Sequence, residues 1–217
     1  QEQRRYQAAL RRASVGMGRV KDLKRLLKLT VNIVARTVRI EHCEIYLSHK
    51  LSERYVLKAS QGWSLADDKR ISFIPTAAPL VSYLKRHPEP LVYDEVKQRG
   101  QDFQDKVLEG IGKVMEELDA ALLVPSFIDE DIIAVIVLGQ KKSGKLYSHD
   151  DLVVFSILAN QVGLAIENAQ FYEDMKKTHN QLMKAEKMAT IGTMADGLSH
   201  QINNRLHAMG FIASDAL

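Results

Sequence analysis

The residues with the clearest capacity for chemistry lie near the C-terminal end of the sequence, in the stretch LSHQINNRL at positions 198–206. His200 carries an imidazole, which can act as a nucleophile and can exchange a proton near neutral pH. Asp196 and Asn204 stand four residues before and after it, so all three share one face of a helix. A carboxylate at Asp196 could hold or accept the second ring proton. The alternative is that His200 is only a solvated polar residue on the outside of a helix.

A heptad pattern surrounds His200 and predicts a coiled coil that would position it. Arg205 occupies the only polar slot of that pattern. With Leu198 at position d and Ile202 at position a, His200 falls at f, on the side farthest from the partner helix. A second domain should therefore be able to reach it. The seam consists of Met188, Ile191, Ala195, Leu198, Ile202, Met209 and Ile212.

A second apolar seam precedes the first and does not continue into it in register. The two fit together only after a slip of one residue between Ala185 and Met188. Such a slip changes the supercoiling locally and makes this junction a candidate switch element. The upstream seam consists of Phe171, Met175, Thr178, Leu182 and Ala185.

Elements of both kinds are expected before this helical region. Gly16 and Gly18 separate a leading helix from an amphipathic helix that begins at Leu23 and ends near Arg39. Two hairpins are predicted, one from the runs CEIYLSH and YVLKASQGW and one from AALLVPSFI and IIAVIVLGQ around an acidic turn. Between the hairpins we expect a loop, a helix at LVSYLKR, an edge strand at LVY, and a helix over residues 103–118.

The last predicted element is one long helix that follows the mobile-looking loop KKSGKLY. The Ser148 hydroxyl can cap it, and Asp150 and Asp151 favour the positive end of the helix dipole. No proline occurs from there to the end of the sequence, so the helix should extend for about 65 residues, a length that a coiled coil accommodates.

Composition excludes several classes of protein. With 46% hydrophobic residues among 217 the chain can bury a core, and a net charge of +3 does not favour nucleic acid as a partner. Cys43 is the only cysteine and cannot form an internal disulfide, which fits a reducing compartment such as the cytoplasm. We expect it in the core. His42, His87 and His149 show no spacing for a metal or haem. We find neither a signal peptide nor an uninterrupted apolar run that spans a bilayer, so we expect membrane attachment only through segments outside this sequence.

The order of elements, and one long string in particular, resembles the GAF family of sensor domains. The string begins with AALLVPSFIDEDIIAVIVLG and ends with AIENAQFYEDM. Between them lie an aromatic residue, Tyr147, and the acidic pair Asp150 and Asp151 at the predicted helix start. The resemblance covers residues 23–172 and implies a twisted antiparallel sheet flanked by helices. It also implies a pocket on one sheet face beneath residues 63–109, with an unidentified ligand, and the residue signature of cyclic-nucleotide GAF domains is not evident. The aromatic residues that either line this pocket or belong to the core are Trp63, Phe73, Tyr83 and Tyr93.

The stretch KAEKMATIGTMADGLSHQINNRLHAM resembles the first helix of the dimerisation and phosphoacceptor domain of sensor histidine kinases. The resemblance implies that His200 accepts a phosphoryl group from ATP and that Asn204 occupies the polar position used in phosphatase action. In that family an acid directly follows the histidine, whereas here Gln201 does, so Asp196 is the candidate for a substitute base. In that family a proline bends the helix at this point. Here Arg205 replaces it, so the residue that causes the bend is missing.

Together these resemblances predict an α+β, GAF-like antiparallel sheet flanked by helices, with a long C-terminal coiled-coil helix. We expect a leading helix at 1–22, a GAF sensor domain at 23–172, a signalling-helix linker at 173–187, and a truncated phosphoacceptor helix at 188–217. The expected function is the sensor portion of a two-component histidine kinase, which would pair as a homodimer through its N-terminal and C-terminal helices.

The partners implied are a response-regulator receiver domain and the ATP-binding domain of the same protein. That domain would bind ATP and Mg²⁺ and is not recognisable in this sequence, so the chain alone should be inactive and is expected to be a piece of a longer protein. The alternative is a non-enzymatic GAF ligand-binding or dimerisation module with a vestigial phosphoacceptor motif.

Overall fold

The fold is that of a computed structural model, which describes residue 8 and residues 22–62 and 71–214. The side chains of Lys50, His200 and residues 204–214 lie outside the description. The chain divides into two compact units, one up to Gln170 and one from Phe171 onward. The first unit contains the sheet and its covering helices, and the second consists of the remainder of the last helix.

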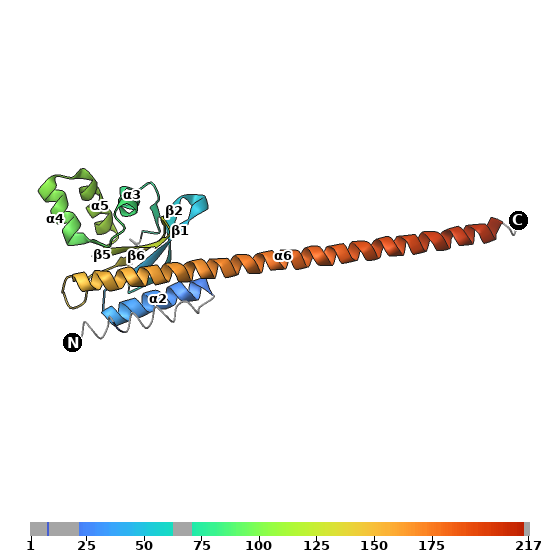
Figure 1. Cartoon of the computed structure of the whole chain (residues 1–217), viewed down its shortest axis with the longest axis horizontal. Helices are drawn as coiled ribbons and strands as arrows, with labels where there is room; N and C mark the ends of the chain where they lie inside the picture. The colour runs from blue at the N-terminus through green and yellow to red at the C-terminus, as the bar shows by residue number, and fades with distance from the viewer. Residues whose placement is uncertain (1–7, 9–21, 63–70, 215–217) are drawn as a thin grey trace. The chain divides into compact units, whose positions relative to one another are not determined.

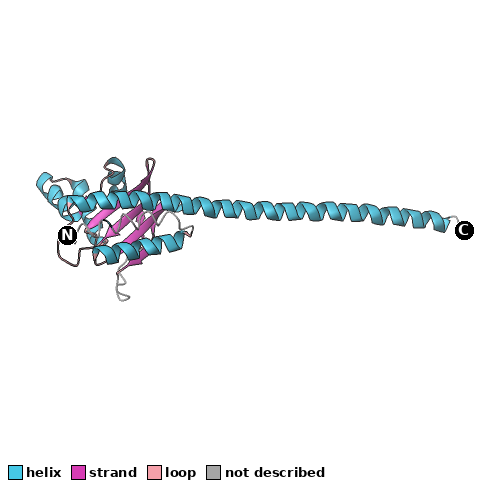
Figure 2. Ribbon diagram, turned by 60° about the horizontal axis from the view of Figure 1, so that its bottom comes forward, coloured by secondary structure: helices cyan, strands magenta, loops and turns pink. Residues whose placement is uncertain are grey.

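A single antiparallel sheet of six strands forms the centre of the first unit (Figures 1 and 2). The order across the sheet is β3-β2-β1-β6-β5-β4, so the two hairpins lie side by side through the pairing of β1 with β6. Irregularities in register occur between Ile45 and Tyr46 and between Ser126 and Phe127. The strands are β1 (Cys43–His49), β2 (Arg54–Gln61), β3 (Phe73–Pro75), β4 (Leu91–Val92), β5 (Leu122–Ile128) and β6 (Asp131–Leu138).

Helices cover both faces of this sheet, and the two groups of helices create two hydrophobic cores (Figure 1). One core joins the sheet to α2 (Leu23–Val38) and to the first part of α6 (His149–Ser214). The other joins it to α3 (Pro79–Arg86), α4 (Tyr93–Phe103) and α5 (Lys106–Glu117). Alternation along β1 explains the division, because Ile45 faces the first core and Tyr46 faces the second.

Side-chain caps fix where several helices begin. The Asp22 carboxylate accepts a hydrogen bond of 2.7 Å from the backbone N–H of Arg25 at the start of α2. Asp105 does the same at the start of α5 and accepts from the N–H groups of Val107 and Leu108. The preceding residue, Gln104, has a φ of 49° and ends α4, so α4 and α5 are separate helices.

The close packing of α6 against the sheet depends on a glycine. A Cβ atom added at Gly163 would lie 2.7 Å from Ser126 Oγ and 3.2 Å from the Phe127 carbonyl oxygen. The Ser126 hydroxyl also donates a hydrogen bond of 2.7 Å to the Ala159 carbonyl of α6 and is buried. The helix and β5 therefore meet almost backbone to backbone, and no larger residue fits between them.

The predicted fold class is confirmed, including both hairpins, the helix at LVSYLKR and the long C-terminal helix. The predicted helix over residues 103–118 was wrong at its start, because Phe103 ends α4 and α5 begins at Lys106. The edge strand at LVY ends before Tyr93, which begins α4. Neither α4 nor β3 was expected from the sequence. The leading helix expected at 1–22 lies outside the described residues except at positions 8 and 22, and Trp63 lies outside them too; the domain boundaries stay predictions.

By length and composition alone, the stretch His149–Asn203 of α6 would suffice to cross a membrane. Half of its most apolar window is buried inside the protein, on the side that faces the sheet. This burial is the pattern of a core helix, since a lipid-facing helix would keep that surface outward.

Candidate functional site

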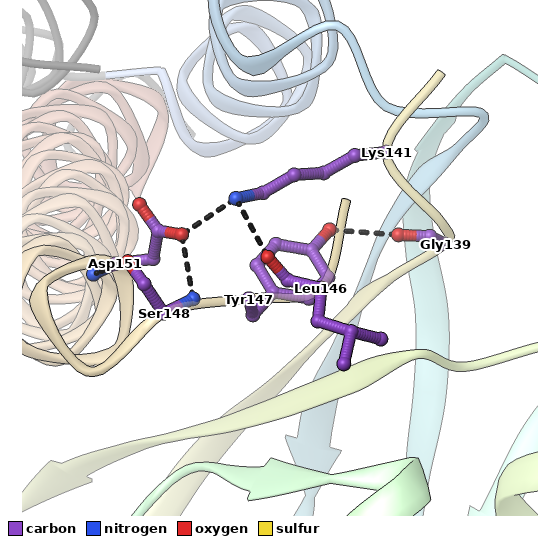
Figure 3. Close-up of polar contacts among 6 residues, drawn as sticks. All are labelled: Gly139, Lys141, Leu146, Tyr147, Ser148 and Asp151. Carbon is purple, nitrogen blue, oxygen red and sulfur yellow. Dashed lines mark hydrogen bonds and ion pairs between the residues drawn. The ribbon is translucent and has the colours of Figure 1, made fainter. Parts of the chain in front are cut away.

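A buried ion pair lies where the loop after β6 meets the first turn of α6 (Figure 3). Lys141 Nζ is 2.5 Å from Asp151 Oδ2 and also donates to the Leu146 carbonyl oxygen at 3.3 Å. The Asp151 side chain is fully buried, and that of Lys141 is 11% exposed. Figure 3 shows the lysine reaching from the loop across to the helix, so this contact joins two consecutive elements.

Asp151 is also part of a reciprocal cap at the start of α6. Its Oδ2 accepts a hydrogen bond of 2.8 Å from the Ser148 backbone N–H, and the Asp151 N–H lies 3.4 Å from Ser148 Oγ. This arrangement satisfies backbone donors that would otherwise lack partners in the first helical turn. The predicted role of Ser148 as a helix cap is confirmed.

Tyr147 packs beneath the lysine and completes the cluster (Figure 3). Its hydroxyl donates 2.7 Å to the Gly139 carbonyl oxygen, and its ring lies 4.9 Å from Lys141 Nζ and edge-on to Phe155. Burial raises the pKa of the Tyr147 hydroxyl, which therefore stays a neutral donor. The loop KKSGKLY, expected to be mobile, is thus anchored at both ends.

A cavity of about 310 Å³ opens beside this cluster. Part of its lining is the loop after β6, with Lys141, Lys145 and Leu146, and another part comes from the start of α4 and the end of α5. Tyr147 and Met115 form buried parts of the lining. Its volume lies at the lower end of the range for small-molecule sites.

A second cavity, of about 400 Å³, lies between α3, β4, α4 and the first turns of α6. Its lining includes the histidines His87 and His149, together with Arg99. The Tyr83 ring stacks on His87 with centroids 4.2 Å apart. This cavity contains both charged and apolar groups, but it shows no cluster of nucleophile and base.

The sheet face on which the sequence predicted a pocket carries a dense apolar core between the strands and α3 and α5. Three side chains with polar groups are buried on this face, those of Glu44, Tyr46 and Tyr55. The Tyr46 hydroxyl lies 2.9 Å from Glu44 Oε2 and 2.8 Å from the Ile71 carbonyl oxygen. Tyr55 donates 3.0 Å to the Ile132 carbonyl oxygen, and burial raises its pKa to about 12. These contacts hold polar groups on the face where the family pocket was expected.

The aromatic residues expected near this pocket have different surroundings. Phe73 lies at the sheet edge, where the Arg54 guanidinium stacks on its ring at 4.4 Å. Tyr83 and Tyr93 pack partly against the second core, and each lines one of the two cavities. The Tyr93 hydroxyl donates to the Glu116 carboxylate.

The residues predicted to carry phosphoryl chemistry lie on α6 within the second unit. The backbone at His200 and Asn204 is helical, and the described Asp196 side chain is exposed. Leu198 and Ile202 are exposed by 59% and 53%, although both are large apolar residues. The geometry therefore matches the predicted helix, whereas its pairing and the roles of His200, Asn204 and Asp196 stay predictions.

The histidines were not expected to bind metal, and the described residues contain no group of three or more metal-ligating side chains. His42 is nevertheless buried, with Nδ1 3.9 Å from Asp119 Oδ2. Its burial lowers its pKa, against the opposing effect of the Asp119 and Glu41 charges. Cys43 is buried as predicted, and burial raises the pKa of its thiol.

Sequence reasoning missed the cluster of Lys141, Tyr147 and Asp151 and the cavity beside it. The sequence contained a signal for the ion pair, because Asp151 occupies the third helical position after a Ser cap. Nothing in the sequence placed Lys141 on that carboxylate, since the contact depends on how the intervening loop folds back.

The fold and one domain match connect this chain to known proteins. Residues 22–168 match the GAF domain family. The GAF domain of an Acinetobacter phosphoenolpyruvate-protein phosphotransferase is similar, with 20% identity, a TM-score of 0.54, and coverage of 74% of this chain and 92% of that one. Free methionine-R-sulfoxide reductase from Neisseria meningitidis, in complex with its substrate, has 15% identity, a TM-score of 0.57, and coverage of 76% and 90%.

A segment of a methyl-accepting chemotaxis protein is also similar, with 13% identity, a TM-score of 0.57, and coverage of 73% of this chain and 96% of that one. At such identities the solved structures establish a common fold, and the sequence match establishes the family. Because that match covers more than half of the sequence, the chain belongs to the GAF domain family.

Proposed function

We propose that this chain is the sensory portion of a two-component histidine kinase, in which a signal received by the GAF domain controls phosphorylation of His200. One observation carries the proposal: the helix that begins at the Ser148 cap of the GAF domain continues without interruption through the stretch LSHQINNRL. A sensor core and a phosphoacceptor motif thus share one helix, which can transmit a change between them.

The surface of α6 beyond Gln170 supports pairing with a second copy. Large apolar side chains are exposed along it at heptad spacing, and water is a poor environment for such a row. We propose a parallel homodimer in which these side chains pack together and His200 points outward. The exposed apolar residues on the two seams are Phe171, Met175, Leu182, Met188, Ile191, Leu198 and Ile202.

In this arrangement a His200 ring nitrogen attacks the γ-phosphorus of ATP, the bond to the bridging oxygen breaks, and ADP leaves. An ATP-binding domain of the same protein would supply ATP with Mg²⁺. Asp196, one helical turn earlier, would hold the other ring nitrogen, and a receiver domain would then take the phosphoryl group. Asn204, one turn later, would orient water for removal of that group from the receiver. Both partners imply a cytoplasmic location.

The offset between the two seams is the point at which we propose that the signal changes the register of the paired helices. Between Ala185 and Met188 the two apolar rows cannot both face a straight partner helix in one register. A change in the GAF domain that favours one seam over the other would rotate the phosphoacceptor face. This rotation would alter the access of the ATP-binding domain to His200.

The test supplies the matching ATP-binding domain in trans, with ATP labelled at the γ-phosphate. We expect acid-labile, alkali-stable label on the wild-type chain and none on His200→Gln. His179→Gln is the matched control, because His179 is an exposed histidine on the same helix. Label on His200→Gln, or equal loss in both variants, would contradict the proposal.

Gln201 gives the alternative its basis, since an amide cannot act as the base that usually follows the phosphoacceptor. If the wild type takes no label while the same ATP-binding domain phosphorylates its own phosphoacceptor domain, the motif is vestigial. The chain would then be a non-enzymatic sensor or dimerisation module.

A further inference from the structure

The cavity beside Lys141 has walls of opposite charge. Its volume of about 310 Å³ corresponds to the space of about ten water molecules. All of the residues that line it belong to the first compact unit. It lies at the junction of the β6–α6 loop with the ends of α4 and α5, apart from the sheet face that carries Glu44 and Tyr46.

Two ammonium groups belong to the wall formed by the loop. Lys141 is mostly buried and is held by Asp151, whereas Lys145 is exposed. Burial and then repulsion from the Lys145 charge lower the pKa of Lys141, while the ion pair with Asp151 favours its charged form. An anionic group between the two lysines would relieve their mutual repulsion.

The part of the lining that comes from α4 and α5 carries carboxylates. Asp94 lies in the first turn of α4, and Glu116 and Asp119 lie at the end of α5 and just beyond it. Glu116 is shared with the Tyr93 hydroxyl and with Lys97, whose Nζ is 3.7 Å away. Asp94 and Asp119 are exposed at this wall, so a cation entering the cavity meets negative charge there.

The remainder of the lining is apolar. Val92, Met115 and Ala120 are buried lining residues, and Leu146 is 70% exposed on the loop. A large apolar side chain exposed beside a cavity gains from contact with an apolar body placed there. A fully polar ligand would leave this surface uncovered.

We propose that this cavity binds a small zwitterion with an apolar body, its anionic group between Lys141 and Lys145 and its cationic group toward Asp94 and Asp119. A purely anionic ligand would face the carboxylate wall, and a purely cationic one would face the lysines, so each should bind less well. The site is additional to the sheet-face pocket that the family resemblance implies, and it does not depend on the kinase proposal.

Three ligands that share a phenylethyl group test the charge requirement by calorimetry on the whole chain. L-Phenylalanine carries both charges, 2-phenylethylamine only the ammonium, and 3-phenylpropionate only the carboxylate. We expect L-phenylalanine to bind at least about tenfold more tightly than either of the others, the effect of losing one charge-assisted contact. Absence of heat with L-phenylalanine, or equal affinity for all three, overturns the proposal.

Two exposed rim residues locate the binding. Lys145→Gln and Asp94→Asn should each weaken L-phenylalanine binding about tenfold without changing the thermal unfolding of the free chain. Lys142→Gln and Glu117→Gln are matched controls, because both residues are exposed neighbours that do not line the cavity. Binding that neither rim variant weakens would place the ligand elsewhere, for instance on the sheet face, and would refute this site.

Discussion

Breaking the ion pair between Lys141 and Asp151 should cost the protein far more stability than the intact pair contributes. At a separation of 2.5 Å and an effective dielectric constant near 20, the attraction is about 7 kcal/mol. Removing two ions from water costs several kcal/mol each, so the intact pair contributes little net stability. Removing one member takes the opposite charge of this pair away from the other, and that is where the large effect lies.

We therefore expect Lys141→Met to lower the free energy of unfolding by about 3 to 4 kcal/mol, since Asp151 is fully buried. Asp151→Asn should cost less, about 2 to 3 kcal/mol, because the partly exposed Lys141 ammonium can turn toward the cavity. The double variant should lose much less than the sum of the two, with a coupling energy of about 2 kcal/mol or more.

Urea unfolding followed by circular dichroism measures these energies, since urea does not screen the ion pair as a salt denaturant would. Lys142→Met and Asp150→Asn are the matched controls, because they change the same residue types at exposed neighbouring positions. Each should alter stability by about 0.5 kcal/mol or less. Additive effects of Lys141→Met and Asp151→Asn would refute the reasoning, because they would mean that neither charge depends on the other.

Three further predictions concern the packing and titration of the domain. Gly163→Ala should destabilise it by about 1 to 3 kcal/mol in urea unfolding, whereas Gly110→Ala, whose added methyl meets no atom within 4 Å, should stabilise it by up to about 1 kcal/mol. Because burial raises the pKa of Cys43, a thiol reagent should label the unfolded chain and leave the folded chain unlabelled at neutral pH; rapid labelling of the folded chain would contradict this. Because burial lowers the pKa of His42, the unfolded state takes up the proton first as pH falls through about 6.5, so stability should drop between about pH 7 and 5 and drop less in His42→Gln; an equal loss in that variant would exclude His42 as the cause.

The sequence predicts local structure well where a residue's role depends on its neighbours along the chain. The alternation in CEIYLSH and the Ser148 cap each depend on a few adjacent residues, and both expectations are confirmed. The start of α4 was missed because no side chain caps it: its first residue, Tyr93, donates its N–H to the Ala121 carbonyl, a contact across the fold. Pairing across the fold likewise determines β3, which is only three residues long.

The candidate sites show the same division. The stretch around His200 can be recognised because its motif is contiguous, and its spacing already specifies which face of the helix it occupies. The cavity could not be predicted, because three separate segments line it, and its acidic and basic residues, Asp94 and Lys145 among them, come together only in the folded domain. The spacing of these residues along the sequence does not show that they line one cavity.

The contact at Gly163 has a mechanical consequence for β5. Where side chains separate a helix from a sheet, a small shift of one can be absorbed by rotamer changes in the layer between them. Ser126 Oγ and the backbone of α6 leave no such layer at this point. A displacement of β5 by a few tenths of an ångström must therefore move the helix backbone itself. At this contact, movement of β5 is transmitted directly to α6.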